Sequence, residues 1–180
     1  MKKKIAKIIW LTGLSGTGKS TISNYLFKLL KKKKIKVLKV DGDIFRKNSG
    51  NNNKFTIQNI TKNNLRIINY VKKKISKYDF IIVSVISPLK KTRNYARKIF
   101  KINYFEVNVH CSFKTLIRRD TKGLYKKALE KKIDNLIGFR SKIKYQKSNY
   151  RVIKINTDKL SIYKSGLKIF NIISDEKKKI

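Results

Sequence analysis

The sequence predicts an α/β fold in which a parallel sheet of about five strands is covered by helices on both faces. Apolar runs of strand length alternate along the chain with stretches whose apolar residues recur at helical spacing. This alternation is typical of parallel sheets with right-handed crossovers. A glycine-rich loop also joins the first strand to the first helix. Because the chain has 180 residues and no internal repeat or linker, we expect one domain over residues 1–180.

The expected strands are apolar or alternating segments, at residues 5–12, 35–40, 80–86, 105–109 and 152–155. The third is continuously apolar, as a fully buried parallel strand is. The expected helices lie at residues 20–30, 56–76, 89–100 and 160–173, with a short one ending at 118–120. Pro88, the only proline, stands where the third of these helices begins, a position that tolerates proline. Residues 131–150 show little periodicity, so no element is assigned there.

The loop after the first strand reads G-L-S-G-T-G-K-S at residues 13–20 and matches the phosphate-binding pattern G-x-x-x-x-G-K-[ST]. Glycines let successive backbone N–H groups face an anion, and the N-terminus of the following helix adds partial positive charge. Lys19 is suited to the β- and γ-phosphates and Ser20 to Mg²⁺. A chance match is the alternative, but the strand before and the helix after argue against it. The expected nucleotide-binding residues are Gly13, Leu14, Ser15, Gly16, Thr17, Gly18, Lys19 and Ser20.

Composition limits the other classes of function. The net charge of +37 would attract ATP, sulfated nucleotides and nucleic acid alike. A coding bias toward Lys, Asn and Ile would also explain this charge, and we favour it over a functional one. No specific nucleic-acid partner is therefore expected. The single cysteine, Cys111, excludes an internal disulfide. No apolar stretch reaches the ~18 residues of a membrane span, and cleavage of a secretory signal would destroy the phosphate loop, so a cytoplasmic protein without a membrane partner is expected.

Further polar residues follow the expected strands. Asp41 and Asp43 end the second strand, where α/β sheets place ligands, so one carboxylate could hold Mg²⁺ or accept a proton; a simple turn is the alternative. Arg93 and Arg97 share one face of a helix and either face solvent or contact an anion. The basic segment 119–128 is either a lid that closes over phosphates or a solvated helix.

Four blocks together resemble the adenylylsulfate kinase (APS kinase) family. They are G-L-S-G-T-G-K-S-T at 13–21, D-G-D-x-x-R at 41–46, I-S-P-x-x-x-x-R-x-x-x-R at 86–97 and R-D-x-K-G-L-Y-K-K-A at 119–128. The resemblance implies a P-loop NTPase-type three-layer sandwich with a mobile basic lid. It also implies the cofactors ATP and Mg²⁺, and phosphorylation of the 3′-hydroxyl of adenosine 5′-phosphosulfate to give ADP and 3′-phosphoadenylyl sulfate. By the same resemblance a homodimer is expected.

The resemblance also implies roles for single residues. Lys19, Asp43 and Ser87 are the expected catalytic residues, with Asp43 as the candidate general base beside the acceptor hydroxyl. Ser20 and Asp43 would hold Mg²⁺, while Thr21 and Arg119 would join the nucleotide-binding residues. The expected substrate contacts are Asp41, Arg46, Phe55, Asn63, Ile86, Ser87, Arg93, Lys122, Gly123 and Leu124. The family serine at position 87 is described as a phosphoserine intermediate, but we expect positioning, because a bound hydroxyl, Mg²⁺ and Lys19 suffice for transfer.

Two departures from the family pattern bear on activity. Ile60 stands where the family has a substrate-binding arginine. The family segment T-G-I-D-S-P-Y-E is degraded over residues 137–146, where only Gly138 and Ser141 remain in register. Lysine-biased drift or relaxed selection on activity would each produce these changes. Two alternatives therefore stay open: a small-molecule kinase with another hydroxyl acceptor, and a nucleotide-binding, nucleic-acid-associated protein that has lost kinase activity.

Overall fold

A five-stranded parallel sheet forms the centre of the computed structural model, which describes residues 5–47 and 55–175. The strand order is β2-β3-β1-β4-β5, and every neighbouring pair is parallel. The strands are β1 (Lys7–Thr12), β2 (Val37–Asp41), β3 (Phe80–Ser84), β4 (Tyr104–His110) and β5 (Ile153–Asn156). The predicted parallel sheet is thus confirmed.

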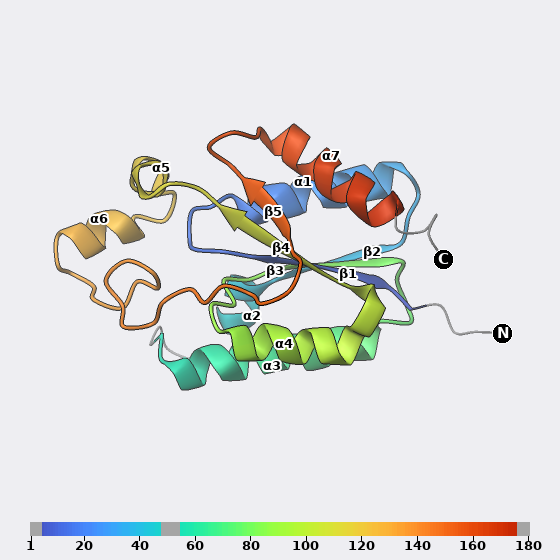
Figure 1. Ribbon diagram of the computed structural model, residues 1–180, viewed down its shortest axis with the longest axis horizontal. Coiled ribbons are helices and arrows are strands. Elements are labelled where there is room, and N and C mark those ends of the chain that lie inside the picture. The colour runs from blue at the N-terminus through green and yellow to red at the C-terminus, as the bar shows by residue number, and fades with distance from the viewer. Residues whose placement is uncertain (1–4, 48–54, 176–180) are drawn as a thin grey trace.

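Helices cover both faces of this sheet (Figure 1). They are α1 (Lys19–Lys32), α2 (Gly42–Lys47), α3 (Ile57–Lys74), α4 (Lys90–Phe100), α5 (Phe113–Arg119), α6 (Leu124–Leu129) and α7 (Ile162–Asp175), with a 3₁₀ turn η1 (Lys101–Asn103) after α4. Figure 1 shows α1 and α7 above the sheet and α3 and α4 below it, so the predicted three-layer sandwich is also confirmed.

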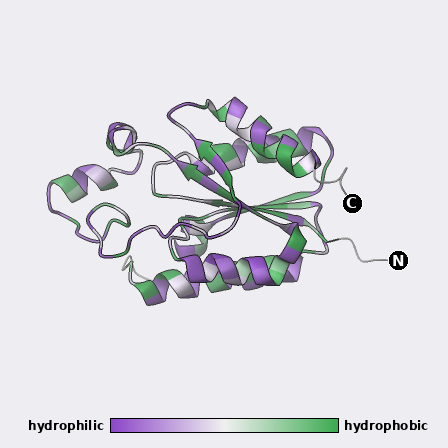
Figure 2. Cartoon of the chain, viewed as in Figure 1, coloured by the Kyte–Doolittle hydropathy of each residue, from purple (hydrophilic) through white to green (hydrophobic). Residues whose placement is uncertain are grey.

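Alternation along the central strand separates the two main cores. Ile9 and Leu11 of β1 belong to the apolar cluster with α1 and α7, whereas Ile8 and Trp10 belong to the cluster with α3 and α4. Successive side chains of a strand point to opposite faces, so one strand serves both layers. In Figure 2 the covering helices mix hydrophilic and hydrophobic residues, as helices with one buried face do.

A third, smaller apolar cluster lies under α5 and α6, which project to one side of the sheet (Figure 1). It contains Leu116, Tyr125, Ala128 and Leu136, and Leu14 of the phosphate loop packs against it. We call residues 113–144 the lid. Its only regular elements are α5 and α6. Residues 131–150, for which the sequence predicted no element, contain no helix or strand.

The segment after β2 begins the short helix α2 instead of forming a simple turn, and Gly42 is required there because a Cβ would lie 2.6 Å from a Val85 methyl. Of the two alternatives for Arg93, exposure to solvent is wrong, because its side chain is completely buried. Within residues 5–47 and 55–175, no helix is both long enough and apolar enough to span a bilayer.

Candidate active site

The phosphate loop connects β1 to α1 with a backbone that only glycine permits at its first position. Gly13 has a φ of 143°, and a Cβ there would lie 2.0 Å from the carbonyl oxygen of Val109 in β4. Its backbone N–H donates to the carbonyl of Ile86, 3.3 Å away, in the segment that follows β3. The start of the loop is therefore fixed between the ends of two neighbouring strands.

Side chains from distant elements hold the carbonyl groups of the loop. Lys19 Nζ donates to the Leu14 carbonyl (2.7 Å), and the Tyr125 hydroxyl donates to the Ser15 carbonyl (2.9 Å). The Thr157 hydroxyl donates to the carbonyl of Thr17 (3.1 Å). With its carbonyls held in this way, the loop is free to present N–H groups to an anion.

Lys19 is the buried cation of this loop, with 8% of its surface exposed. Burial, the largest influence, and then the nearby charge of Lys122 lower the pKa of its ammonium group to about 8, although Asp43 and Asp41 act in the opposite direction. A polyphosphate bound here would supply the missing negative charge and stabilise the protonated form.

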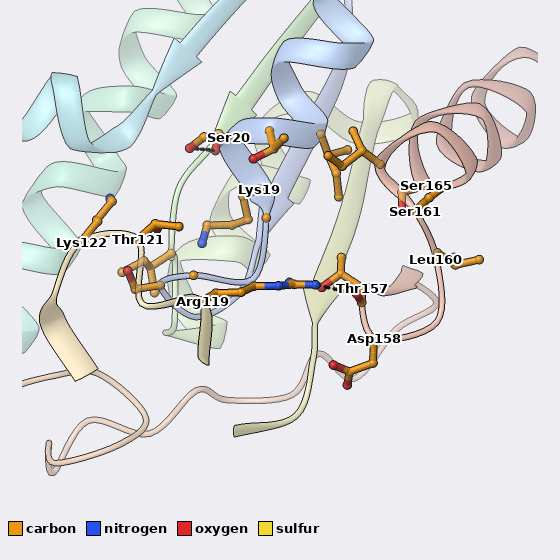
Figure 3. Close-up of a pocket in the computed structure, with 18 of the residues that line it drawn as sticks. Lys19, Ser20, Arg119, Thr121, Lys122, Thr157, Asp158, Leu160, Ser161 and Ser165 are labelled. Carbon is orange, nitrogen blue, oxygen red and sulfur yellow. Dashed lines mark hydrogen bonds between the residues drawn. The ribbon is translucent and has the colours of Figure 1, made fainter. Parts of the chain in front are cut away.

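A cavity of about 620 Å³ opens in front of the loop, which is the size of a nucleotide site. Figure 3 shows Thr121 and Lys122 of the lid on one side and Thr157, Asp158 and Leu160 on the other, with Lys19 between them. The cavity is lined by Ser15, Gly16, Gly18–Ile22, Asp43, Ser84–Ile86, Arg119, Thr121, Lys122, Thr157–Ile162 and Ser165. Most of the nucleotide-binding residues predicted from the sequence thus meet Asp43, Ile86 and Lys122 in one cavity, whereas Gly13, Leu14 and Thr17 do not line it.

The two aspartates after β2 differ in their surroundings. Asp41 accepts a hydrogen bond from the Ser20 hydroxyl (3.2 Å) and another from the Asp43 backbone N–H (2.9 Å). Asp43 instead forms an ion pair with Lys122, and about half of each side chain is exposed. Burial raises the pKa of Asp43, but the hydrogen bond and charge of Lys122, together with Arg46 and Lys19, more than offset it and lower the pKa below 3.8.

The surroundings of Ser20 fit a hydrated magnesium ion. Mg²⁺ usually takes one or two protein oxygens, with water and substrate phosphates completing its shell. The Ser20 hydroxyl and the Asp41 carboxylate, which already touch, offer that pair. In the described part of the chain no group of three or more His, Cys, Asp or Glu side chains could cage a metal. The arrangement favours Asp41 over the predicted Asp43 as the metal-linked carboxylate.

The expected acceptor region consists of Asp43, Arg46, Phe55, Asn63 and Ser87. The Arg46 guanidinium lies 4.3 Å from the centre of the Phe55 ring and covers one face of it. Asn63 is 2% exposed, and neither amide atom has a hydrogen-bond partner among the described residues. The hydroxyl of Ser87, a residue 1% exposed with a φ of 45°, likewise has no partner there. Buried polar atoms need hydrogen-bond partners, which a bound ligand or an ordered water would supply here.

Only Ile86 and Lys122 of the ten expected substrate contacts line the cavity; the other eight are Asp41, Arg46, Phe55, Asn63, Ser87, Arg93, Gly123 and Leu124. Arg93 donates to Glu106 Oε1 (3.1 Å) and to the carbonyl of Ser87 (2.6 Å), and its third nitrogen is engaged by Gln146. Gly123 precedes α6 with a φ of 62°, and Leu124 packs against the apolar cluster of the lid. The structure therefore supports a structural role for Arg93, while direct contact of these eight residues with substrate stays a prediction.

Sequence reasoning missed the segment after β5. Arg119 donates to the hydroxyl (2.9 Å) and the carbonyl (2.8 Å) of Thr157, so the base of the lid is joined to this segment (Figure 3). Ser165 of α7 also lines the cavity, and its buried hydroxyl has no partner among the described residues. Thr157 and Asp158 follow the carboxyl end of a parallel strand, the usual place for ligands, and that signal could have found them.

Comparison with known proteins supports this arrangement. Residues 5–155 match the family described as adenylylsulphate kinase. An adenylyl-sulfate kinase of Halothermothrix orenii is 32% identical over 98% of this chain and 94% of its own. A cytidine diphosphoramidate kinase of Campylobacter jejuni is 40% identical over 73% of this chain and 76% of its own.

A solved structure agrees with these relatives in fold. It is the APS kinase CysC of Mycobacterium tuberculosis in complex with AMPPNP and APS, which is 28% identical to this chain. The match has a TM-score of 0.86 and covers 94% of this chain and 98% of that protein. Since the family match spans the sheet, the phosphate loop and the lid, the chain belongs to the adenylylsulfate kinase family.

Proposed function

We propose that this protein transfers the γ-phosphoryl group of ATP to the 3′-hydroxyl of adenosine 5′-phosphosulfate. The observation that carries the proposal is a single cavity that contains both the phosphate loop with Lys19 and the carboxylate of Asp43. Phosphoryl transfer needs mainly positioning and charge stabilisation, and this cavity offers a buried cation on one side and a proton acceptor on the other. Membership of the family and the likeness to a structure in complex with AMPPNP and APS support the same reaction.

Each side of the cavity has a separate task in this proposal. Lys19 neutralises charge on the transferring group, and the segment from Thr157 to Ser165 forms the wall against which the rest of ATP would rest. Ser20 and Asp41 would hold Mg²⁺, which bridges the β- and γ-phosphates and neutralises developing charge.

Asp43 acts on the acceptor. Its lowered pKa keeps the carboxylate ionised at neutral pH, so it orients the acceptor hydroxyl and takes its proton as the new bond forms. Lys122 must leave Asp43 when the acceptor enters, because it occupies one carboxylate oxygen. The released Lys122 would then face the anionic acceptor.

Ser87 positions substrate in this scheme and receives no phosphoryl group. Its hydroxyl is buried in a residue 1% exposed, which leaves little room for an in-line attack on ATP. The neighbouring Ile86 lines the cavity, so the segment that contains Ser87 borders the space between the phosphate donor and the acceptor nucleotide.

A second acceptor is favoured by one specific observation. Ile60 is 2% exposed and offers no hydrogen-bond donor at the position where the family has a substrate-binding arginine. The relative at 40% identity is a cytidine diphosphoramidate kinase. The acceptor in that name has cytosine in place of adenine and a phosphoramidate in place of the sulfate of adenosine 5′-phosphosulfate. A kinase with the same chemistry but a cytidine nucleotide acceptor is therefore the alternative.

A coupled assay of ADP release tests both candidates. Purified protein with ATP and Mg²⁺ is given adenylyl sulfate or cytidine diphosphoramidate, and Lys19→Ala serves as the background control. We expect adenylyl sulfate to stimulate ADP release at least tenfold more efficiently in kcat/KM. Preference for the cytidine compound would establish the alternative, and no stimulation by either compound would contradict both. The homodimer and the cytoplasmic location stay predictions, and light scattering after gel filtration would test the former.

A further inference from the structure

A buried polar network lies behind the phosphate loop; of the expected site residues it engages Arg93, and the proposed reaction does not use it. Its centre is the ion pair between Arg93 of α4 and Glu106 of β4, whose side chains are 0% and 1% exposed. Ser148 and Tyr150 both donate hydrogen bonds to Glu106, and the Ser148 hydroxyl also accepts from Arg93 (3.2 Å). The pair therefore fastens residues 145–150, which contain no helix or strand, to the sheet.

The same segment reaches the phosphate loop through one hydroxyl. Tyr145 lies under the Arg93 guanidinium, 4.9 Å from ring centre to the guanidinium carbon. Its hydroxyl lies 3.1 Å from Thr12 Oγ1 and accepts a hydrogen bond from Asn108 Nδ2 (2.9 Å). Thr12 is completely buried and directly precedes Gly13 of the loop.

The direction of these hydrogen bonds follows from counting protons. A hydroxyl has one proton to donate, and that of Thr12 points to the carbonyl of Ile86. Tyr145 must therefore donate to Thr12, and Asn108 donates to Tyr145. This chain of bonds ends at the Ile86 carbonyl, which also accepts from the Gly13 N–H. Burial raises the pKa of the Tyr145 phenol, so this donor keeps its proton at neutral pH.

We propose that Tyr145 is a positioning residue. Through Thr12 it holds the start of the phosphate loop against residues 86 and 87, which follow β3, and Arg93 fixes Tyr145 in place. Arg93 acts on the same junction directly, because it donates to the Ser87 carbonyl (2.6 Å). The donor and acceptor sides of the cavity therefore share one support. The segment that looked degraded in sequence supplies this support at the end of the lid.

The test compares Tyr145→Phe with the matched control Tyr150→Phe. Both changes remove one partly buried hydroxyl from the same network, but the Tyr150 hydroxyl donates to Glu106 and its ring lies under Arg97, away from the bond to Thr12. The measurements are the affinity for AMPPNP by calorimetry, kcat and KM for the acceptor that is turned over, and the thermal unfolding midpoint. The affinity for AMPPNP needs no acceptor, so it decides this inference even if the proposed function fails.

We expect Tyr145→Phe to lower the affinity for AMPPNP and kcat by about three- to tenfold, the range for one lost hydrogen bond. Both variants should lower the thermal unfolding midpoint by similar amounts, but Tyr150→Phe should change the affinity for AMPPNP and kcat by less than twofold. In a double-mutant cycle, Tyr145→Phe should add little to Thr12→Val, because Tyr145 acts through the Thr12 hydroxyl, and Thr12→Ser should retain wild-type affinity. If Tyr145→Phe leaves affinity and kcat within twofold of wild type, or if Tyr150→Phe lowers both equally, the positioning role is wrong.

Discussion

The phosphate loop and the expected acceptor region differ in how completely their polar groups are satisfied without a ligand. In the loop, the carbonyls of Leu14, Ser15 and Thr17 each accept a hydrogen bond from a side chain. In the acceptor region, by contrast, Asn63 and Ser87 are buried with polar atoms that have no partner among the described residues.

The charged groups of the two regions show the same contrast. In the loop, Lys19 is buried and donates to a carbonyl of the loop itself. In the acceptor region, Lys122 pairs with Asp43 and Arg46 lies on the Phe55 ring, so these two cations cover groups that the acceptor would need. A buried polar group without a partner costs about 1–3 kcal/mol, so binding of the acceptor regains free energy that the empty region lacks. We infer that the phosphate loop is preformed and that the acceptor region is completed by its ligand.

The largest predicted effect comes from the preformed loop. Lys19→Ala should lower kcat by about 10³-fold or more, because it removes the buried charge that stabilises the transferring group. The ADP-release assay measures the loss, and circular dichroism checks that the fold is retained. Near-normal turnover by a folded variant would show that Lys19 of the phosphate loop does not take part in the reaction.

The two aspartates should separate next. Asp43→Asn is expected to lower kcat by ~10²-fold or more at any Mg²⁺ concentration, because the proton acceptor is lost. Asp41→Asn should lose less activity and regain part of it at high Mg²⁺, since Asp41 lies at Ser20. Titration of Mg²⁺ in the same assay distinguishes the two variants. If high Mg²⁺ restored the activity of Asp43→Asn and not that of Asp41→Asn, Asp43 would be the Mg²⁺ ligand and Asp41 the proton acceptor.

A pH titration sharpens the account of Lys19. Its pKa of about 8 lies below the ordinary 10.5, and the negative charge of a bound phosphate should raise it again. Above pH 8 the affinity for AMPPNP should therefore fall by up to about tenfold per pH unit. Over the same range the unfolded chain holds more protons at this residue, so its contribution to the free energy of unfolding should rise with pH. Calorimetry and denaturant unfolding, each compared with Lys19→Ala, would show opposite trends; an affinity that stays constant to pH 9.5 would contradict the lowered pKa.

The smallest effect is predicted for the Ser87 hydroxyl. Ser87→Ala should reduce kcat/KM for the acceptor by less than about tenfold, as expected for one hydrogen bond to substrate. Intact-mass measurement during turnover should find no phosphorylated wild-type protein. Complete loss of activity in Ser87→Ala, with phosphoserine trapped in the wild type, would make Ser87 the covalent carrier.

Local patterns in the sequence predicted the sheet and the phosphate loop, because both arise from short-range periodicity and spacing. They did not predict the partners of Arg93, since an arginine on an amphipathic helix is ordinarily exposed and Glu106 is distant in sequence. Gly138 and Ser141, the two residues kept in the degraded segment, now have physical reasons. A Cβ at Gly138 would lie 2.6 Å from a Leu14 methyl, and the Ser141 hydroxyl accepts the N–H of Ile143 (3.0 Å).

Hydrogen exchange with and without ligands tests the contrast between the two regions most directly. AMPPNP alone should protect the loop amides that contact its phosphates and leave residues 42–47, 55–64 and 119–125 nearly unchanged. Addition of the acceptor nucleotide should then slow exchange strongly in those three segments, because the bound acceptor holds them together. Strong protection of the three segments by AMPPNP alone, with no further change on addition of the acceptor, would contradict the account.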